Sequence, residues 1–158
     1  MKWIFYLLTV LFVSACSQVG KQLPEFNYTS IDGELISSSG IENRPIVINV
    51  WATWCGSCLQ EIPALNRLKD KYKDSDVVFL AFSDEPKSTI EYVLDRYEFN
   101  YTQVPNAGTF IRKIKTRFVK TYPQNIVVNR KGEIVFEITE GNTDIYKDLD
   151  RELSKLQN

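Results

Sequence analysis

Residues 45–58 read PIVINVWATWCGSC, an apolar and largely β-branched run that ends in a Cys-x-x-Cys pair. The nearly continuous run of apolar residues over 45–51 predicts a strand that is buried on both faces. From Gly56 to about Tyr72 apolar residues recur at intervals of three and four, which predicts an amphipathic helix with a kink at Pro63. The cysteine pair therefore lies where a buried strand ends and a helix begins.

Further strands and helices are expected on both sides of this segment. Before it, residues 26–36 are typical of a β-hairpin with its turn at Asp32-Gly33. After it, the order of strand, helix and strand favours a parallel sheet with right-handed crossovers, and so an α/β fold. The later elements are expected as a strand over 77–82, a helix over 87–97, a short strand over 101–104, a basic helical stretch reaching Phe118, strands over 125–129 and 133–138, and a helix over 144–156.

Length and charge limit the class of protein. A chain of 158 residues has the size of one compact domain, and its 19 basic residues are balanced by 20 acidic ones. Nucleic-acid binding normally shows a clear excess of positive charge. We therefore expect one globular domain with no nucleic-acid partner.

The two cysteines of the pair have different expected roles. Cys55 at a helix N-terminus faces unpaired amide donors and the positive end of the helix dipole, which both stabilise a thiolate. Cys58 lies one turn further on the same face, close enough to form a disulfide with Cys55. Cys55 is the expected nucleophile toward a client disulfide, and Cys58 the thiol that resolves the mixed disulfide.

A structural disulfide and a metal site are the competing interpretations of this pair. A disulfide that closes so short a loop removes little entropy from the unfolded chain. A metal site needs further soft or imidazole ligands, yet the chain has no histidine and its remaining cysteine is Cys16. Redox exchange is therefore favoured, with the Cys55–Cys58 disulfide as the redox group and with no metal or other cofactor.

The first residues have the pattern of an export signal. Lys2 precedes an apolar run from Trp3 to Val13, which is much shorter than the ~20 residues of a membrane-spanning helix. Val13-Ser14-Ala15-Cys16 resembles the lipobox of bacterial lipoproteins, in which the cysteine is alkylated with diacylglycerol and becomes the first residue. An ordinary signal cleaved near Ala15 is the alternative, although an A-x-A-like site is absent.

This pattern divides the chain into three parts. Residues 1–15 are expected to be a lipoprotein signal peptide, residues 16–24 the lipidated Cys16 and a polar tether, and residues 25–158 the folded domain. The protein would then be exported from the reducing cytosol and held on a bacterial membrane by its lipid, facing the periplasm. The alternative is the outer surface of a Gram-positive bacterium.

The active-site segment resembles the thioredoxin superfamily, and within it the TlpA/ResA-like membrane-tethered reductases. The close match covers Val47 to Cys58 and the following Glu61-Ile62-Pro63. The wider resemblance runs from about Leu23 to the C-terminus. The resemblance implies a thioredoxin-like fold with an N-terminal β-hairpin and a central insertion over residues 84–118. It also implies that Thr121-Tyr122-Pro123 is a cis-proline loop beside the cysteines, so that Trp54, Tyr122 and Pro123 would contact the client.

Glu61 is a candidate proton acceptor. It matches the acidic helix residue of TlpA/ResA-like proteins, and it lies one turn beyond Cys58 on a helix side that is otherwise apolar. A carboxylate there can take the proton of Cys58 as this thiol attacks. The alternative is an ordinary solvated helix residue. Asn49 occupies the position of the buried aspartate of thioredoxins, or is only a polar group satisfied in the core.

Three functions are compared on this basis. The first is reduction of disulfides in exported proteins, including apocytochrome c during cytochrome c maturation, by a monomer that receives electrons from a membrane-embedded thiol donor. The absence of histidine between the cysteines disfavours a strong oxidant. The second is a peroxiredoxin-like peroxidase, but Thr53-Trp54-Cys55 is one residue short of a Thr-x-x-Cys setting. The third is a non-catalytic binding module, which usually lacks one cysteine.

Overall fold

The predicted strand over 45–51 is the central strand of a five-stranded mixed sheet in the computed structural model, which describes residues 17–115, 122–139 and 144–157. The strand order is β5-β4-β3-β6-β7, with β3 parallel to β4 and antiparallel to β6. All five residues of β3 are buried, as its nearly continuous apolar sequence, broken only by Asn49, predicts. The strands are β3 Ile46–Val50, β4 Val78–Phe82, β5 Thr102–Val104, β6 Gln124–Val128 and β7 Ile134–Thr139.

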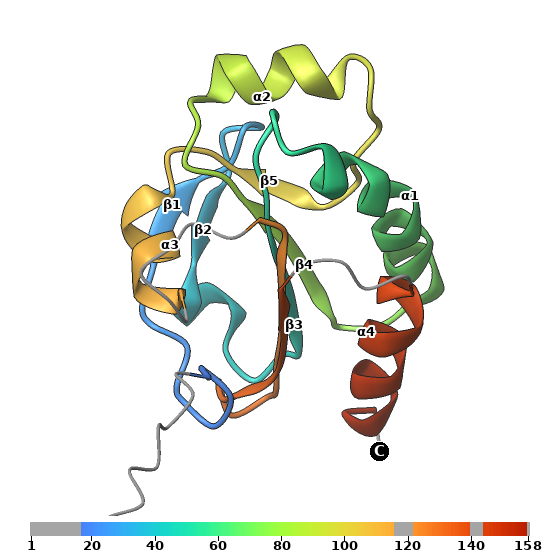
Figure 1. The fold of residues 1–158 in the computed structure, drawn as a ribbon. Helices are drawn as coiled ribbons and strands as arrows, with labels where there is room; N and C mark the ends of the chain where they lie inside the picture. Colours follow the sequence, from blue (N-terminus) through green and yellow to red (C-terminus); the bar gives the residue numbers. More distant parts are fainter. Residues whose placement is uncertain (1–16, 116–121, 140–143, 158) are drawn as a thin grey trace, which may run out of the picture.

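Four α-helices are described around this sheet. Helices α1 and α4 lie side by side on one face, and α3 lies on the opposite side together with the N-terminal hairpin (Figure 1). Helix α1 turns Cys58, Ile62, Leu65 and Leu68 toward the sheet, which is the stripe that the sequence periodicity predicts. The helices are α1 Gly56–Lys71, α2 Lys87–Leu94, α3 Gly108–Ile114 and α4 Ile145–Lys155.

The predicted N-terminal hairpin forms a separate small sheet. Strand β1, Asn27–Thr29, pairs antiparallel with β2, Leu35–Ser37, and the short 3-10 helix η1 follows over Ser38–Ile41. Gly33 in the connecting turn has a φ of 88°, a conformation that glycine adopts without a steric cost. Phe26, just before β1, packs edge-on against Phe82 of β4. The hairpin is thereby joined to the main core.

The thioredoxin-like α/β class is confirmed. Most strand and helix ends lie within one residue of the prediction, and the larger differences are at the ends of α2 and α3. Helix α2 ends at Leu94 rather than at Tyr97. The Tyr97 side chain is exposed, so extending the helix to it would bury no further apolar surface. Helix α3 ends at Ile114, and Phe118 lies outside the described residues. The expected central insertion supplies α2, α3 and β5, and β5 is the edge strand of the sheet next to β4.

Residues 17–24 are the described part of the expected polar tether. This part is bound to the sheet, because the amide of Gly20 donates to the carbonyl of Ile134 over 2.8 Å and that of Leu23 donates to Gly132 over 2.8 Å. Gln22 also forms an isolated antiparallel bridge with Glu133. This pairing has no signature in the sequence, since the segment lacks the alternation of a strand. Cys16 and the predicted signal peptide lie outside the described residues.

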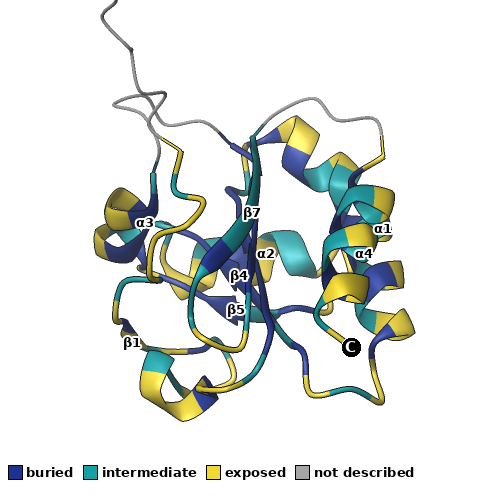
Figure 2. Ribbon diagram, turned by 90° about the horizontal axis from the view of Figure 1, so that it is seen from below, coloured by how far each residue is buried: buried dark blue, intermediate teal, exposed yellow. Residues whose placement is uncertain are grey.

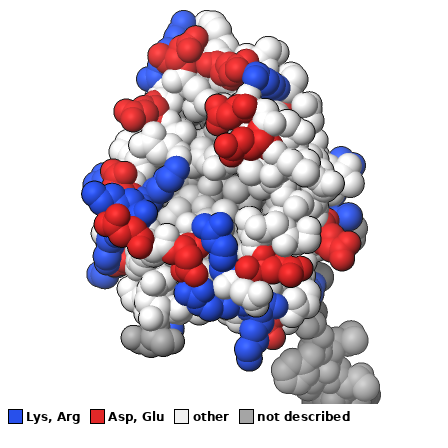
Figure 3. All heavy atoms as spheres, turned by 180° about the vertical axis from the view of Figure 1, so that it is seen from behind, with Lys and Arg blue, Asp and Glu red and all other residues white. Residues whose placement is uncertain are grey.

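Burial follows the layers of the fold. Buried residues line the strands and the inner sides of the helices, and exposed residues cover their outer sides (Figure 2). On the face seen in Figure 3, Lys and Arg are interspersed with Asp and Glu instead of gathering by sign. Among the described helices, none has the length and apolar character needed to cross a membrane.

Candidate active site

The cysteine pair stands at the first turn of α1. Cys55 is the N-cap residue of this helix and is joined to Cys58 by a disulfide, with the two Cα atoms 5.3 Å apart. The amide of Cys58 donates to Sγ of Cys55 over 3.2 Å. The predicted position of the pair at a strand-to-helix junction is confirmed, and it directs a helix N-terminal amide at the sulfur of Cys55.

The residues expected to contact a client come together beside this pair. Trp54, immediately before Cys55, is 67% exposed, and its ring meets the Tyr122 ring edge-on with centroids 5.5 Å apart. The peptide bond between Tyr122 and Pro123 is cis, as the resemblance implies. Burial and the nearby Asp84 carboxylate raise the pKa of Tyr122 to about 12. One exposed aromatic side chain, that of Trp54, therefore lies next to the disulfide and packs against the buried Tyr122 ring.

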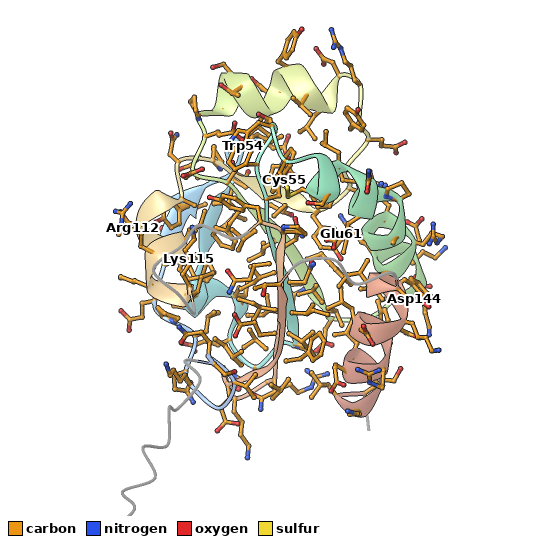
Figure 4. The ribbon with its side chains drawn as sticks, in the orientation of Figure 1. Trp54, Cys55, Glu61, Arg112, Lys115 and Asp144 are labelled. Carbon is orange, nitrogen blue, oxygen red and sulfur yellow. A yellow bond between two sulfur atoms is a disulfide. The ribbon has the colours of Figure 1, made fainter. Side chains whose placement is uncertain are left out.

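The Glu61 carboxyl group is hydrogen-bonded to a pair of buried amide side chains, so Glu61 is not a freely solvated helix residue. It lies on the side of α1 that faces the sheet (Figure 4). Asn125 of β6 donates from Nδ2 to Oε2 of Glu61 over 2.9 Å, and Asn49 of β3 donates to Oδ1 of Asn125 over 2.8 Å. Burial raises the pKa of Glu61 and outweighs the opposing effect of the Asn125 hydrogen bond. A carboxyl group whose pKa is raised by burial beside a redox pair is a candidate for proton transfer.

A second carboxylate holds the loop that leads into Cys55. Glu85 accepts hydrogen bonds from the backbone amide of Thr53 over 2.7 Å and from its hydroxyl over 2.6 Å. Ser83 donates to the same carboxylate over 3.1 Å. Sequence patterns did not single out Glu85. The available signal was its place just after β4, because parallel neighbours such as β3 and β4 end at the same edge of a sheet.

Similarity to known proteins covers most of the chain. Residues 19–137 match the model of the AhpC/TSA family. The chain belongs to the AhpC/TSA family. Among its relatives, the thiol-disulfide oxidoreductase ResA of a Bacillus cereus strain is 30% identical over 122 residues, which are 77% of this chain and 69% of that protein.

Solved structures share the fold at lower sequence identity. A thioredoxin-family thiol:disulfide interchange protein from Chlorobium tepidum TLS superposes with a TM-score of 0.73 at 20% identity, covering 87% of this chain and 96% of that one. A secreted Mycobacterium tuberculosis disulfide oxidoreductase, homologous to E. coli DsbE, gives a TM-score of 0.69 at 16% identity, covering 83% and 96%. With its Cys-x-x-Cys pair and its ResA relatives, the chain is a thiol-disulfide oxidoreductase.

Proposed function

We propose that this protein reduces disulfides of exported proteins by dithiol exchange, with Cys55 as nucleophile, Cys58 as resolving thiol and Glu61 as proton acceptor. One observation carries the proposal: a Cys-x-x-Cys disulfide caps α1, with a semi-buried carboxyl group one turn beyond it. The exposed Trp54, which packs on Tyr122 of the Tyr122-Pro123 loop, supplies a surface for an extended client chain. The name of the ResA relative, a thiol-disulfide oxidoreductase, supports the same chemistry.

The exchange has two steps. The Cys55 thiolate attacks one sulfur of the client disulfide, so that a mixed disulfide forms and one client thiolate leaves. The Cys58 proton passes to Glu61, and the Cys58 thiolate attacks Sγ of Cys55, which releases the second client thiolate. Two electrons have then moved from the dithiol to the client, and the Cys55–Cys58 disulfide is restored. A membrane-embedded thiol donor would reduce it again.

The charges near Cys55 favour reduction over oxidation. Strong oxidants of this kind stabilise the nucleophilic thiolate, usually with a cationic neighbour. Here residues 56–60 at the start of α1 include no Lys or Arg, and the loop before Cys55 is held by the Glu85 carboxylate through Thr53. Without a cation in this turn the Cys55 thiolate gains less stabilisation than in a strong oxidant, so the reduced pair is a better electron donor.

The proposed location is the outer side of a bacterial membrane, with a lipid on Cys16. The amide of Gln18 donates to Oε2 of Glu137 over 3.1 Å, so the bound part of the chain starts two residues after Cys16. Two extended residues span at most about 7 Å. Such a tether would hold the domain directly against the lipid surface, close to a membrane-embedded electron donor. Apocytochrome c is a client class that fits this place, with cytochrome c maturation as the process.

Trapping the mixed disulfide tests the proposal. A Cys58→Ser variant, reduced and mixed with an exported protein that contains a disulfide, should accumulate a covalent adduct through Cys55, because no thiol is left to resolve it. The matched Cys55→Ser variant keeps the Cys58 thiol, which should form an adduct much more slowly than Cys55 does. Equally fast trapping by the two variants, or faster trapping through Cys58 in Cys55→Ser, would reject the assigned roles.

A further inference from the structure

The Tyr101 hydroxyl is a buried polar group that the mechanism above does not use. Tyr101 is 2% exposed, and its hydroxyl has no hydrogen-bond partner among the described residues. The ring is fixed by Phe79 and Phe99, with centroid distances of 5.1 Å and 5.0 Å. A buried donor without a partner is rare in folded proteins, and it commonly marks a functional role or a bound water.

The sheet register places this side chain on the same face as the amides below Glu61. Asn125, Asn49, Ala81 and Gln103 occupy directly paired positions on β6, β3, β4 and β5, so they form one row across the sheet. Tyr101 precedes Gln103 by two residues and therefore lies on the same face. The only side chain between Gln103 and Asn49 in this row is the methyl group of Ala81. A long side chain from the β5 edge can reach over it toward Asn49.

The polar atoms of Gln103 are already engaged. Nε1 of Trp51 donates to Oε1 of Gln103 over 3.1 Å, and Nε2 of Gln103 donates to the carbonyl of Tyr101 over 2.9 Å. At the other end of the row, Oε2 of Glu61 accepts from Asn125, whereas its Oε1 receives no hydrogen bond from any described residue. Glu61 thus has an open acceptor on the face of the sheet to which Tyr101 belongs.

The electrostatics of the two groups agree with this pairing. Burial and the charge of Glu61 raise the pKa of Tyr101 well above its usual range, so the hydroxyl keeps its proton and can donate it in a hydrogen bond to a carboxylate. The titratable groups beside Glu61 are Cys58 on α1 and Tyr101 before β5. Strands β3 and β6 present the neutral amides of Asn49 and Asn125. Helix α4, which packs on α1, buries the apolar residues Ile145, Leu149 and Leu153.

We propose that Tyr101 is a positioning residue for proton transfer, whose hydroxyl donates a hydrogen bond, directly or through one water, to Oε1 of Glu61 in the reduced protein. Asn125 and Tyr101 then hold the carboxylate from two sides and turn it toward Cys58. The hydroxyl stabilises the ionised form of Glu61, which is the form that accepts the Cys58 proton. The catalytic part of this inference rests on the proposed function, whereas the contact between Tyr101 and Glu61 does not.

Tyr101→Phe tests the contact because it removes only the hydroxyl. Carbon-13 NMR of the Glu61 carboxyl group, in the reduced and oxidised forms of the full domain, should show the Glu61 pKa rising by about one unit in the variant, the size expected for the loss of one hydrogen bond to a charged group. The control is Tyr72→Phe. Tyr72 lies at the far end of α1, where its hydroxyl donates to Asp150 of α4. An unchanged Glu61 titration in Tyr101→Phe overturns the proposal.

Kinetics separate the contact from the proposed catalytic role. The pH profile for release of the mixed disulfide should move to higher pH by the same amount as the Glu61 titration. In a Glu61→Gln background, Tyr101→Phe should have no further effect on the release rate. A further loss there would place the hydroxyl in another role and reject the inference. A shifted NMR titration with an unmoved pH profile would keep the contact and reject Glu61 as the base.

Discussion

Asn125 donates a hydrogen bond from Nδ2 to Oε2 of Glu61 over 2.9 Å and so joins β6 to α1 next to the redox pair. Asn49 lies directly opposite Asn125 in the β3–β6 ladder and donates to its Oδ1. The carboxyl group is therefore supported by neutral donors and by no cationic partner within this chain of contacts. Since burial is the larger influence, the Glu61 pKa stays above its ordinary value of 4.5.

This relationship predicts how stability depends on pH. In the native state Glu61 binds its proton more tightly than in the unfolded state, so its contribution to stability is fully present below 4.5 and is lost as the pH rises through the raised native pKa. Glu61→Gln removes this titration but retains an oxygen for Asn125. The free energy of unfolding of the wild type should thus fall relative to that of Glu61→Gln between mildly acidic and neutral pH.

Urea denaturation of the oxidised proteins at a series of pH values measures this difference. Glu98→Gln is a suitable control, because it removes one carboxyl group at an exposed position between α2 and β5, away from the cysteine pair. Parallel stability profiles for the wild type and Glu61→Gln would mean that Glu61 titrates normally in the folded protein.

A second prediction concerns the loop before Cys55. Thr53→Val keeps the shape of the side chain but removes the hydroxyl that donates to Glu85 over 2.6 Å. Loss of a hydrogen bond to a charged acceptor should lower the free energy of unfolding by about 1–2 kcal/mol. Thr109→Val, at an exposed hydroxyl on α3 that accepts from Arg112, should change it by less than about 0.5 kcal/mol. Equal effects of the two substitutions would contradict a special role for Glu85.

Much of the fold could be predicted because its local patterns are strong. The apolar run over 45–51 indicated the central strand, and the spacing of apolar residues indicated α1 and α4 to within one residue at their starts. The place of Cys55 at the strand-to-helix junction followed from the central strand and α1 alone. The cis bond before Pro123 was implied only by the resemblance, since X-Pro bonds are mostly trans and no local rule distinguishes this one.

Other features depend on contacts between distant residues. The pairing of Gly20 and Leu23 with the β6–β7 turn joins residues more than a hundred positions apart, and a polar, irregular segment carries no sign of it. The sequence likewise gives no sign that Glu85 bonds to Thr53. Tyr101 could not be singled out either, because a buried tyrosine looks like an ordinary core residue in the sequence. Sequence periodicity identifies which residues are buried, but the strand register decides which buried polar groups meet.

The lipid anchor is tested by changing Cys16, which lies outside the described residues. Cys16→Ala removes the thiol that the lipobox pattern assigns to diacylglycerol, so the protein should move from the membrane fraction to the soluble periplasmic fraction. The bound acyl chains contribute ~0.8 kcal/mol per buried methylene, so the expected change is nearly complete. Ser17→Ala is the neighbouring control and should stay with the membrane. Retention of Cys16→Ala on the membrane would require another anchor.

The final prediction separates the two steps of exchange at Glu61. If Glu61 accepts the Cys58 proton, Glu61→Gln should leave the first attack by Cys55 nearly unchanged. Release of the mixed disulfide should become slower by roughly ten- to a hundredfold, the lower part of the usual range for general-base help. Because the chain has no histidine to replace the carboxylate, mixed disulfide with a client peptide should accumulate.

Stopped-flow measurement across pH distinguishes the possible roles of this carboxyl group. A higher pH should partly restore the second step in Glu61→Gln, since hydroxide can then generate the Cys58 thiolate. In the wild type the second step should lose speed as the pH falls through the raised Glu61 pKa, because a protonated carboxyl group cannot accept a proton. An unchanged second step in the variant would make Glu61 a bystander. A slowed first step would instead place its effect on Cys55.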